Sequence, residues 1–97
     1  HPNFTISGSD LRHELQVPLA DAVLGGTVRV PTLDGAVEMK VPSWSSSGRT
    51  LRLKSKGLPK RGGGRGDLLV SLRVELPETP DPELEALMRK WRGEAAD

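Results

Sequence analysis

Alternation of apolar and polar residues along the chain predicts several short strands. Residues 11–17 place an apolar or weakly polar side chain at every second position, the pattern of a half-buried strand, and Pro18 ends the run. Residues 4–6 and 50–53 predict two shorter strands, and residues 67–76 predict the longest one. Strand patterns therefore account for much of the apolar content of the chain.

The dipeptide Asp34-Gly35 predicts a β-hairpin. Asp-Gly suits a two-residue type I′ turn, which needs positive φ at both central positions. Such a turn gives a register that gathers the apolar side chains on one face. Pro31 has no backbone N–H for the ladder, so we expect the first strand of the hairpin to lie at a sheet edge or to end near Pro31. The expected pairs on the apolar face are Val30 with Met39, Val28 with Val41, and Thr32 with Val37.

Two helices are predicted, a short one over residues 19–24 and a longer one after Asp81. Gly25-Gly26 closes the first helix, while Asp81 is placed to cap the second and Pro82 suits its first turn. Apolar residues at positions i, i+3, i+4 and i+7 form one stripe on the second helix: Leu84, Leu87, Met88 and Trp91. About eleven residues are too few for a stable isolated helix. We therefore expect this stripe to pack on the domain itself or on another chain.

Composition and charge narrow the class of protein. The chain has 97 residues, enough for one domain with a modest core, and its 11 glycines and 8 prolines favour short strands and turns. Cysteine is absent, which excludes disulfides and thiolate chemistry, and the net charge is only +1. No apolar run approaches the roughly 18 residues that span a bilayer, and no signal peptide opens the sequence. We expect a cytoplasmic domain that is a piece of a longer protein.

No set of residues indicates an enzyme. The serines at 45–47 have no histidine nearby in the sequence to act as a base, and no spacing pairs two carboxylates for acid–base catalysis. The two histidines are far apart, which disfavours a structural zinc site. We predict a non-enzymatic protein that needs no metal or cofactor.

The basic, glycine-rich segment of residues 57–66 has two interpretations. A phosphate-binding loop would open a helix, whereas this segment leads into the strand of residues 67–76. A nucleic-acid-binding module would use the cations of this region, which are Lys54, Lys56, Lys60, Arg61 and Arg65. A solvated connecting loop agrees better with the near-zero net charge and the scarcity of aromatic residues.

The two tryptophans are candidate interface residues. Trp44 lies in a serine-rich loop, where it either anchors an interface or covers the edge of a small core. Trp91 ends the apolar stripe of the second helix. For Trp91 we favour an interface, because its helix lies outside the predicted sheets.

Several motifs, in order along the chain, resemble the second C-terminal β-domain of DnaJ/Hsp40 co-chaperones. They are Asp10-Leu11, residues 17–26 (VPLADAVLGG), residues 30–35 (VPTLDG), Lys40-Val41-Pro42, Gly48, residues 51–57 (LRLKSKG) and residues 66–70 (GDLLV). The resemblance extends from about residue 1 to residue 92. Because it depends on many motifs rather than one glycine run, it is specific.

This resemblance implies a mainly β fold of two small, sandwich-like sheets with one short helix and a C-terminal helix. Residues 1–77 would form the β-domain II, and residues 78–97 the dimerisation helix and tail. The family further implies binding of unfolded polypeptide clients, homodimerisation through Leu84, Leu87, Met88 and Trp91, and delivery of clients to Hsp70 by the full-length protein. The J-domain is not among these residues, so we expect no stimulation of Hsp70 ATP hydrolysis by this piece alone.

The resemblance also suggests a client groove. In the first β-domain of the family, the groove is lined by the strands before and after the short helix. Aligning the strand before the short helix with this sequence places the corresponding groove positions at His13, Leu15, Val28 and Val30. The alternative is that these four residues form the core, and a third hypothesis is a purely structural dimerisation domain that binds no client.

Overall fold

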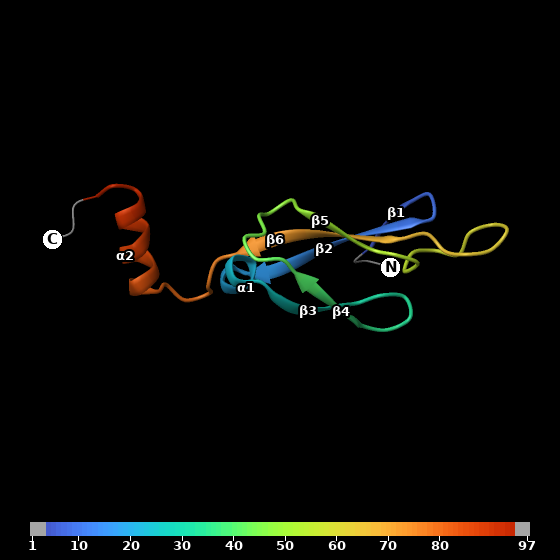
Figure 1. Cartoon of the computed structure of the whole chain (residues 1–97), viewed down its shortest axis with the longest axis horizontal. Coiled ribbons are helices and arrows are strands. Elements are labelled where there is room, and N and C mark those ends of the chain that lie inside the picture. The colour runs from blue at the N-terminus through green and yellow to red at the C-terminus, as the bar shows by residue number, and fades with distance from the viewer. Residues whose placement is uncertain (1–3, 95–97) are drawn as a thin grey trace.

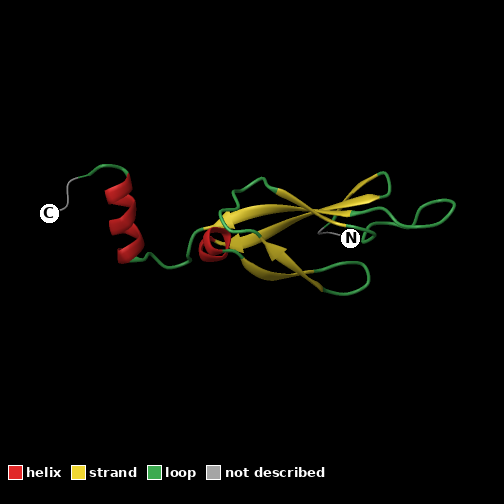
Figure 2. Cartoon of the chain, in the orientation of Figure 1, coloured by secondary structure: helices red, strands yellow, loops and turns green. Residues whose placement is uncertain are grey.

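The computed structural model describes residues 4–94, which form a β unit followed by a separate helix (Figures 1 and 2). The elements in order are β1 (Thr5–Ser7), β2 (Asp10–Pro18), α1 (Leu19–Leu24), β3 (Gly26–Val30), β4 (Val37–Val41), β5 (Thr50–Leu53), β6 (Leu68–Glu75) and α2 (Pro82–Trp91). A four-stranded sheet has the order β1-β2-β6-β5, and β3 and β4 form a second sheet. This confirms the mainly β fold of two sheets, one short helix and a C-terminal helix.

The parallel pairing of β2 with β6 is the centre of the larger sheet. Leu11 lies opposite Leu68 and Val17 lies opposite Val74, so the alternating apolar residues of both strands share one face. A parallel pair needs a long connection, and here that connection contains α1, the second sheet and β5. The chain therefore passes back along its own sheet, with the β3–β4 hairpin beside β2 and β6 (Figure 1). Core residues from both sheets pack together, so this hairpin covers the apolar face of the larger sheet.

The core lies between the two sheets. The larger sheet and α1 contribute Leu11, Val17, Ala22, Leu68, Val70 and Leu72, and the smaller sheet contributes Val30, Met39 and Val41. Four of these side chains are completely enclosed, and three more are only 2% exposed. Full burial of a Val or Leu side chain contributes about 1.5–3 kcal/mol, so the contact between the sheets is the main stabilising feature of the β unit.

The β3–β4 hairpin forms, but the predicted Asp34-Gly35 turn and its register were wrong. Strand pairing is shifted by two residues from the expected one, with Val30 opposite Val37 and Val28 opposite Met39. Leu33 and Asp34 are the central turn residues; the positive φ lies at Gly35, 109°, just after them. This arrangement is typical of a type I turn, with glycine in its fourth position.

A threonine hydroxyl explains why the turn moves. Thr32 Oγ1 accepts a hydrogen bond from the Asp34 amide at 3.2 Å and also donates to the Gly35 carbonyl. Because the shift is an even number of residues, every side chain stays on its predicted face. The prediction that β6 is the longest strand was also wrong, since β2 has 9 residues and β6 has 8.

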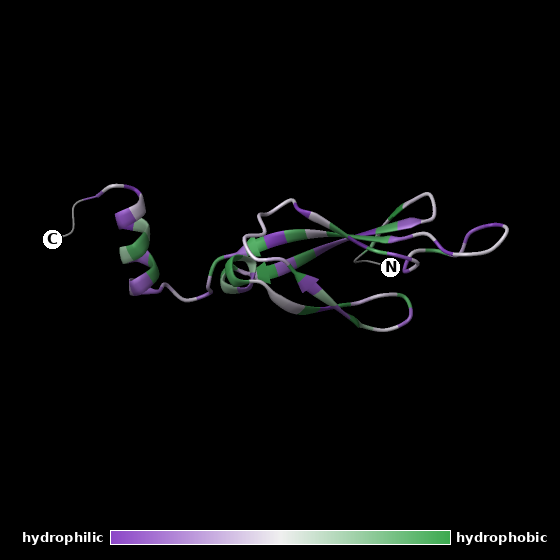
Figure 3. Ribbon diagram, viewed as in Figure 1, coloured by the Kyte–Doolittle hydropathy of each residue, from purple (hydrophilic) through white to green (hydrophobic). Residues whose placement is uncertain are grey.

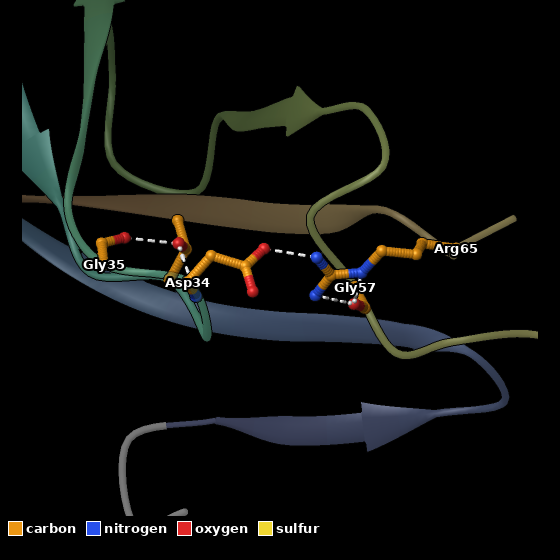
Figure 4. A network of polar contacts seen from close by, with 5 residues as sticks. Asp34, Gly35, Gly57 and Arg65 are labelled. Atoms are coloured by element: carbon orange, nitrogen blue, oxygen red, sulfur yellow. Dashed lines mark hydrogen bonds and ion pairs between the residues drawn. The ribbon is translucent and has the colours of Figure 1, made fainter.

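An arginine joins the ends of the two sheets. Arg65 donates from Nε and Nη2 to the Gly57 carbonyl at 3.0 and 2.7 Å, and its Nη1 forms an ion pair with the Asp34 carboxylate (Figure 4). Asp34 belongs to the β3–β4 turn, whereas Gly57 and Arg65 belong to the glycine-rich segment between β5 and β6. The contact therefore fastens the hairpin turn to the larger sheet.

The glycine-rich segment is a connecting loop with an ordered base. Gly57 donates to the Gly66 carbonyl at 2.8 Å, and Leu58 donates to the Ser9 carbonyl at 2.8 Å. The outer residues of the loop, including Lys60 and Arg61, are exposed. The predicted solvated loop is thus present, but backbone hydrogen bonds hold its base against the β1–β2 turn.

A surface ion pair connects the central strands on the solvent side. Arg73 Nη1 donates to Glu14 Oε1 at 2.9 Å. This hydrogen bond, together with the charge of the carboxylate, raises the pKa of the Arg73 guanidinium. Both side chains are well exposed, so solvent screens the pair and it adds little to stability.

The close packing at Gly57 gives a test of the fold. A Cβ at this position would lie 2.6 Å from the Ser9 carbonyl oxygen, and the nearby atoms are all backbone. We expect Gly57→Ala to lower the free energy of unfolding by at least about 2 kcal/mol, measured by urea denaturation. Gly26→Ala is the control, because its nearest heavy atom is 3.8 Å away. Equal midpoints for the two variants would contradict the packing.

Candidate functional site

Helix α2 begins where its sequence predicts. Asp81 Oδ1 accepts hydrogen bonds from the amides of Glu83 and Leu84 at 2.9 and 3.3 Å, and Pro82 occupies the first turn. Glu85 also forms an ion pair with Arg89, one turn later, at 3.5 Å. Acidic residues in the first turn and basic residues in the last turn complement the helix dipole. Local sequence is therefore enough to explain why the helix lies here.

The apolar side of α2 has no cover. We call Leu84, Leu87, Met88 and Trp91 the α2 stripe. None of the residues of α2 is buried, and Trp91 is 65% exposed. Figure 1 shows α2 standing apart from the β unit, and Figure 3 shows hydrophobic as well as hydrophilic residues along it. A ten-residue helix gains most of its stability from packing, so this stripe is a candidate binding surface.

A groove runs along the stripe. It has a volume of about 650 Å³ and is lined by Leu76, just after β6, and by Leu84, Met88 and Trp91 of the helix. The segment between β6 and α2 contains Pro77 and Pro80. The groove therefore lies between the helix and the residue at which the chain leaves the β unit.

The four residues predicted for a client groove all face the space between the sheets. His13 and Leu15 come from β2, and Val28 and Val30 from β3. Val30 is fully enclosed and His13 is 9% exposed, with its ring 5.3 Å from that of Phe4. Leu15 and Val28 are half-buried against the core. Leu15 and Val28 are therefore the members of this set that another molecule can reach.

Trp44 does not cover the core, since it is 73% exposed. Its amide donates to the Val23 carbonyl at 3.0 Å, and the next amide, of Ser45, donates to the Ala22 carbonyl at 2.9 Å. These bonds tie the loop to the end of α1 and hold Trp44 at a φ of 59°, an uncommon value for a bulky residue. The structure therefore presents the indole on the surface from a firmly held backbone.

The cations of the alternative nucleic-acid site are divided between two roles. Arg65 is engaged by Asp34 and Gly57, as described above, and Lys56 is half-buried. Lys54, Lys60 and Arg61 are exposed. Among residues 4–94, no three acidic or histidine side chains are grouped in a way that could hold a metal ion. Neither helix in this range is long and apolar enough to cross a membrane.

Comparison with known proteins identifies the family. The family model for the DnaJ C terminal domain matches residues 1–77. The chain belongs to the DnaJ C-terminal domain family. This is a family of non-enzymatic chaperone domains, in agreement with the prediction from the sequence.

Individual DnaJ chaperones match almost the whole chain. The chain is 52% identical over 94 residues to "Chaperone protein DnaJ 2" of Nocardia farcinica, covering 96% of this chain and 24% of that protein. It is 46% identical over 92 residues to the protein of the same name from Synechocystis, covering 95% and 30%. It is 50% identical over 90 residues to that from Thermus thermophilus, covering 93% and 32%. The DnaJ domain described here thus spans about a quarter to a third of these relatives.

The α1 end of this DnaJ domain was not foreseen as a surface. Leu24 is 78% exposed at the end of α1, and Leu76 is 75% exposed just after β6. The sequence position of these residues could have indicated their exposure. Leu24 directly precedes the glycines that end α1, and Leu76 directly precedes a proline. Each lies where a regular element stops, so its side chain is no longer directed at the core.

The cap of α2 gives a second prediction. Asp81→Ala removes the acceptor of two backbone amides, and we expect α2 to lose about 1 kcal/mol of stability. Amide hydrogen exchange in α2 should then become about fivefold faster, while exchange in β2 and β6 stays unchanged. Glu78→Ala, in the same linker, is the matched control. Unchanged exchange in Asp81→Ala would show that the cap does not support the helix.

Proposed function

We propose that this DnaJ C-terminal domain forms a homodimer through the α2 stripe and binds unfolded polypeptide clients. In the full-length protein, acting in the cytoplasm, the bound clients are then delivered to Hsp70. The observation that carries the proposal is the uncovered row of Leu, Met and Trp side chains on a helix too short to be stable alone. Exposed apolar patches of this kind mark interaction sites.

Twofold pairing suits a single amphipathic helix. An isologous interface uses the same patch of both copies, so one exposed stripe is enough for each subunit. Trp91 is the most exposed member of the stripe, and large aromatic residues in a desolvated interface commonly dominate its energy. Dimerisation would also stabilise α2 itself, because each helix would gain the packing that its own chain does not provide.

Client binding would use the accessible parts of the space between the sheets. Leu15 and Val28 offer apolar contact, and the second sheet has only two strands. The outer edges of β3 and β4 therefore have backbone groups that no strand pairs within residues 4–94. An extended client can add to such an edge through main-chain hydrogen bonds, which makes few demands on its sequence. This suits a chaperone that accepts many clients.

Dimerisation would strengthen weak client binding. Two modest sites on one dimer can hold two segments of the same unfolded chain, and the second contact becomes intramolecular. Overall affinity then rises without tighter individual contacts. This connects the two halves of the proposal, because α2 would set the effective concentration of client sites.

Removal of the stripe tests dimerisation. We expect Trp91→Ala, and truncation after Pro80, to shift the protein to monomer in sedimentation equilibrium, because both remove apolar area from the interface. Ala86→Ser is the control, since Ala86 lies on the side of α2 away from the stripe. If both variants sediment as dimers, the α2 stripe is not the interface.

A peptide titration tests client binding. In the Trp91→Ala background, where avidity is removed, an unfolded apolar peptide should shift the NMR signals of Leu15, Val28 and neighbouring residues. Val28→Thr keeps the shape of the side chain but replaces one methyl group with a hydroxyl, and we expect it to weaken binding about three- to tenfold. Ile6→Thr, on exposed β1, should bind as the parent does. Absence of any shift in the presence of peptide would favour a purely structural dimerisation domain.

A further inference from the structure

Positive charge is concentrated on β5 and the loop that follows it. Residues 49–65 have seven basic side chains and no acidic one, although the net charge of the whole chain is only +1. Two of the seven form ion pairs, Arg52 with Asp67 and Arg65 with Asp34. No ion pair within residues 4–94 involves the other five. The surface of this segment therefore attracts negatively charged groups.

The acidic groups beside this segment are already engaged. Asp67 Oδ1 accepts a hydrogen bond from the Ser55 amide at 3.0 Å, and Asp10 Oδ1 accepts one from the Asp67 amide at 2.8 Å. Asp67 Oδ2 lies 3.4 Å from Arg52 Nε, but the Arg52 side chain is still 59% exposed. A second carboxylate can therefore reach this guanidinium, and most of the charge of residues 49–65 has no compensation from the chain itself.

Polar and apolar side chains alternate along β5. Thr50 and Arg52 are exposed on the face of the larger sheet that lies away from the core. Leu51 and Leu53 are half-buried and pack against the core. Lys54 directly follows the strand and is exposed as well. The strand therefore has cationic side chains on one face and apolar side chains on the other.

The backbone of β5 has a free outer edge. The larger sheet has the order β1-β2-β6-β5, so among the described strands β5 pairs only with β6. The Leu72 amide donates to the Arg49 carbonyl at 2.8 Å, which fixes the residues of this segment whose backbone groups point at β6. Because these directions alternate along an antiparallel strand, the backbone groups of Thr50 and Arg52 point outward. An extended polypeptide can form main-chain hydrogen bonds with such an edge.

The chemistry of this surface favours a polypeptide ligand over a nucleic acid. Single-stranded nucleic acids bind through aromatic side chains on which the bases stack, and residues 49–65 contain no aromatic residue. The exposed Trp44 lies in the loop after β4, where it is tied to the end of α1. A free strand edge, by contrast, is matched by a peptide backbone. The cations then indicate that the peptide is acidic.

We propose that the outer edge of β5 binds an extended polypeptide segment in which acidic and apolar residues alternate. The segment adds to the larger sheet as a further strand, with its carboxylates beside Arg52 and Lys54 and its apolar side chains beside Leu51 and Leu53. Opposite charges on neighbouring strands stabilise their pairing. This surface is separate from the β3–β4 edges proposed above for unfolded clients, and the inference does not depend on dimerisation.

A peptide titration with the whole chain tests the ligand chemistry. The probe is a fluorescently labelled peptide of about seven residues in which Glu and Val alternate, and binding is measured by fluorescence anisotropy. A peptide with the same residues in one Glu block and one Val block should bind at least about fivefold more weakly, because its carboxylates do not share one face. Lys in place of Glu should abolish binding. Equal affinity for all three peptides would overturn the proposal.

Charge variants test the location of the site. The double variant Arg52→Gln, Lys54→Gln should weaken binding of the alternating peptide at least about fivefold. The matched control, Arg29→Gln with Lys40→Gln, removes the same charge from exposed positions of β3 and β4 and should bind as the parent does. An equal or larger loss in the control would mean that the peptide responds to overall charge or binds the smaller sheet, and the assignment to β5 would be wrong.

A proline variant tests whether the ligand binds by strand addition. Thr50→Pro removes an outward amide without removing a cation, and proline is tolerated at the first residue of an edge strand. We expect at least about fivefold weaker binding, whereas Thr50→Val keeps the amide and should bind as the parent does. If the two variants bind equally well, the peptide does not pair with the β5 backbone.

Two N-methylated peptides provide a measurement that does not depend on the folding of a variant. In one the alternating peptide is methylated at its Glu amides, and in the other at its Val amides. Only one edge of an added strand faces β5, so one peptide should lose binding and the other should keep it. Equal binding of both peptides would contradict strand addition. Single-stranded RNA that binds more tightly than the Glu–Val peptide, and that is released by Arg52→Gln, Lys54→Gln, would replace the polypeptide by a nucleic acid as the ligand and overturn the proposal.

Discussion

The parallel pairing of β2 with β6 is the constraint from which the rest of the structure follows. It places the alternating apolar residues of two strands far apart in the sequence on one face, and this face needs cover. A parallel pair also requires a long connection. In this chain the connection supplies the cover itself, as α1 and the β3–β4 hairpin. The direction of β6 then decides where the chain leaves the β unit, and so where α2 lies.

The two ends of the β unit differ in chemistry because of this arrangement. At one end, Arg65 joins the hairpin turn to the glycine-rich loop through Asp34 and the Gly57 carbonyl. At that end of the β unit, these polar contacts hold the two sheets together. At the other end, the elements stop on Leu24 and Leu76, and the adjoining loop presents Trp44. A small domain does not contain enough chain to cover every apolar side chain. Leu24, Trp44 and Leu76 are exposed at the end next to the helix that is proposed to pair, while Ile6 and Leu33 are exposed elsewhere.

This distribution bears on how the chain could combine the two proposed binding activities. A dimer interface needs large, well-positioned apolar groups, and the α2 stripe is the proposed source of them. Client binding needs shallow contact and free strand edges that accept many sequences. In this chain the two sets of features lie on different elements, since Leu15 and Val28 belong to β2 and β3. Proposed dimerisation therefore does not compete with client binding for the same residues.

Local sequence determined the elements of this protein, whereas tertiary contacts decided how they meet. The alternation in residues 11–17, the Asp81 cap and the glycines after α1 predicted their elements because propensity, capping and periodicity act within a few residues. The hairpin turn was misplaced because the Thr32 hydroxyl and Gly35 favour a different turn, whose Asp34 carboxylate meets an arginine 31 residues away. The burial of Val30 and the exposure of Trp44 depend on which segments lie opposite them. Such long-range contacts are set by the packing of whole sheets, and no local pattern encodes them.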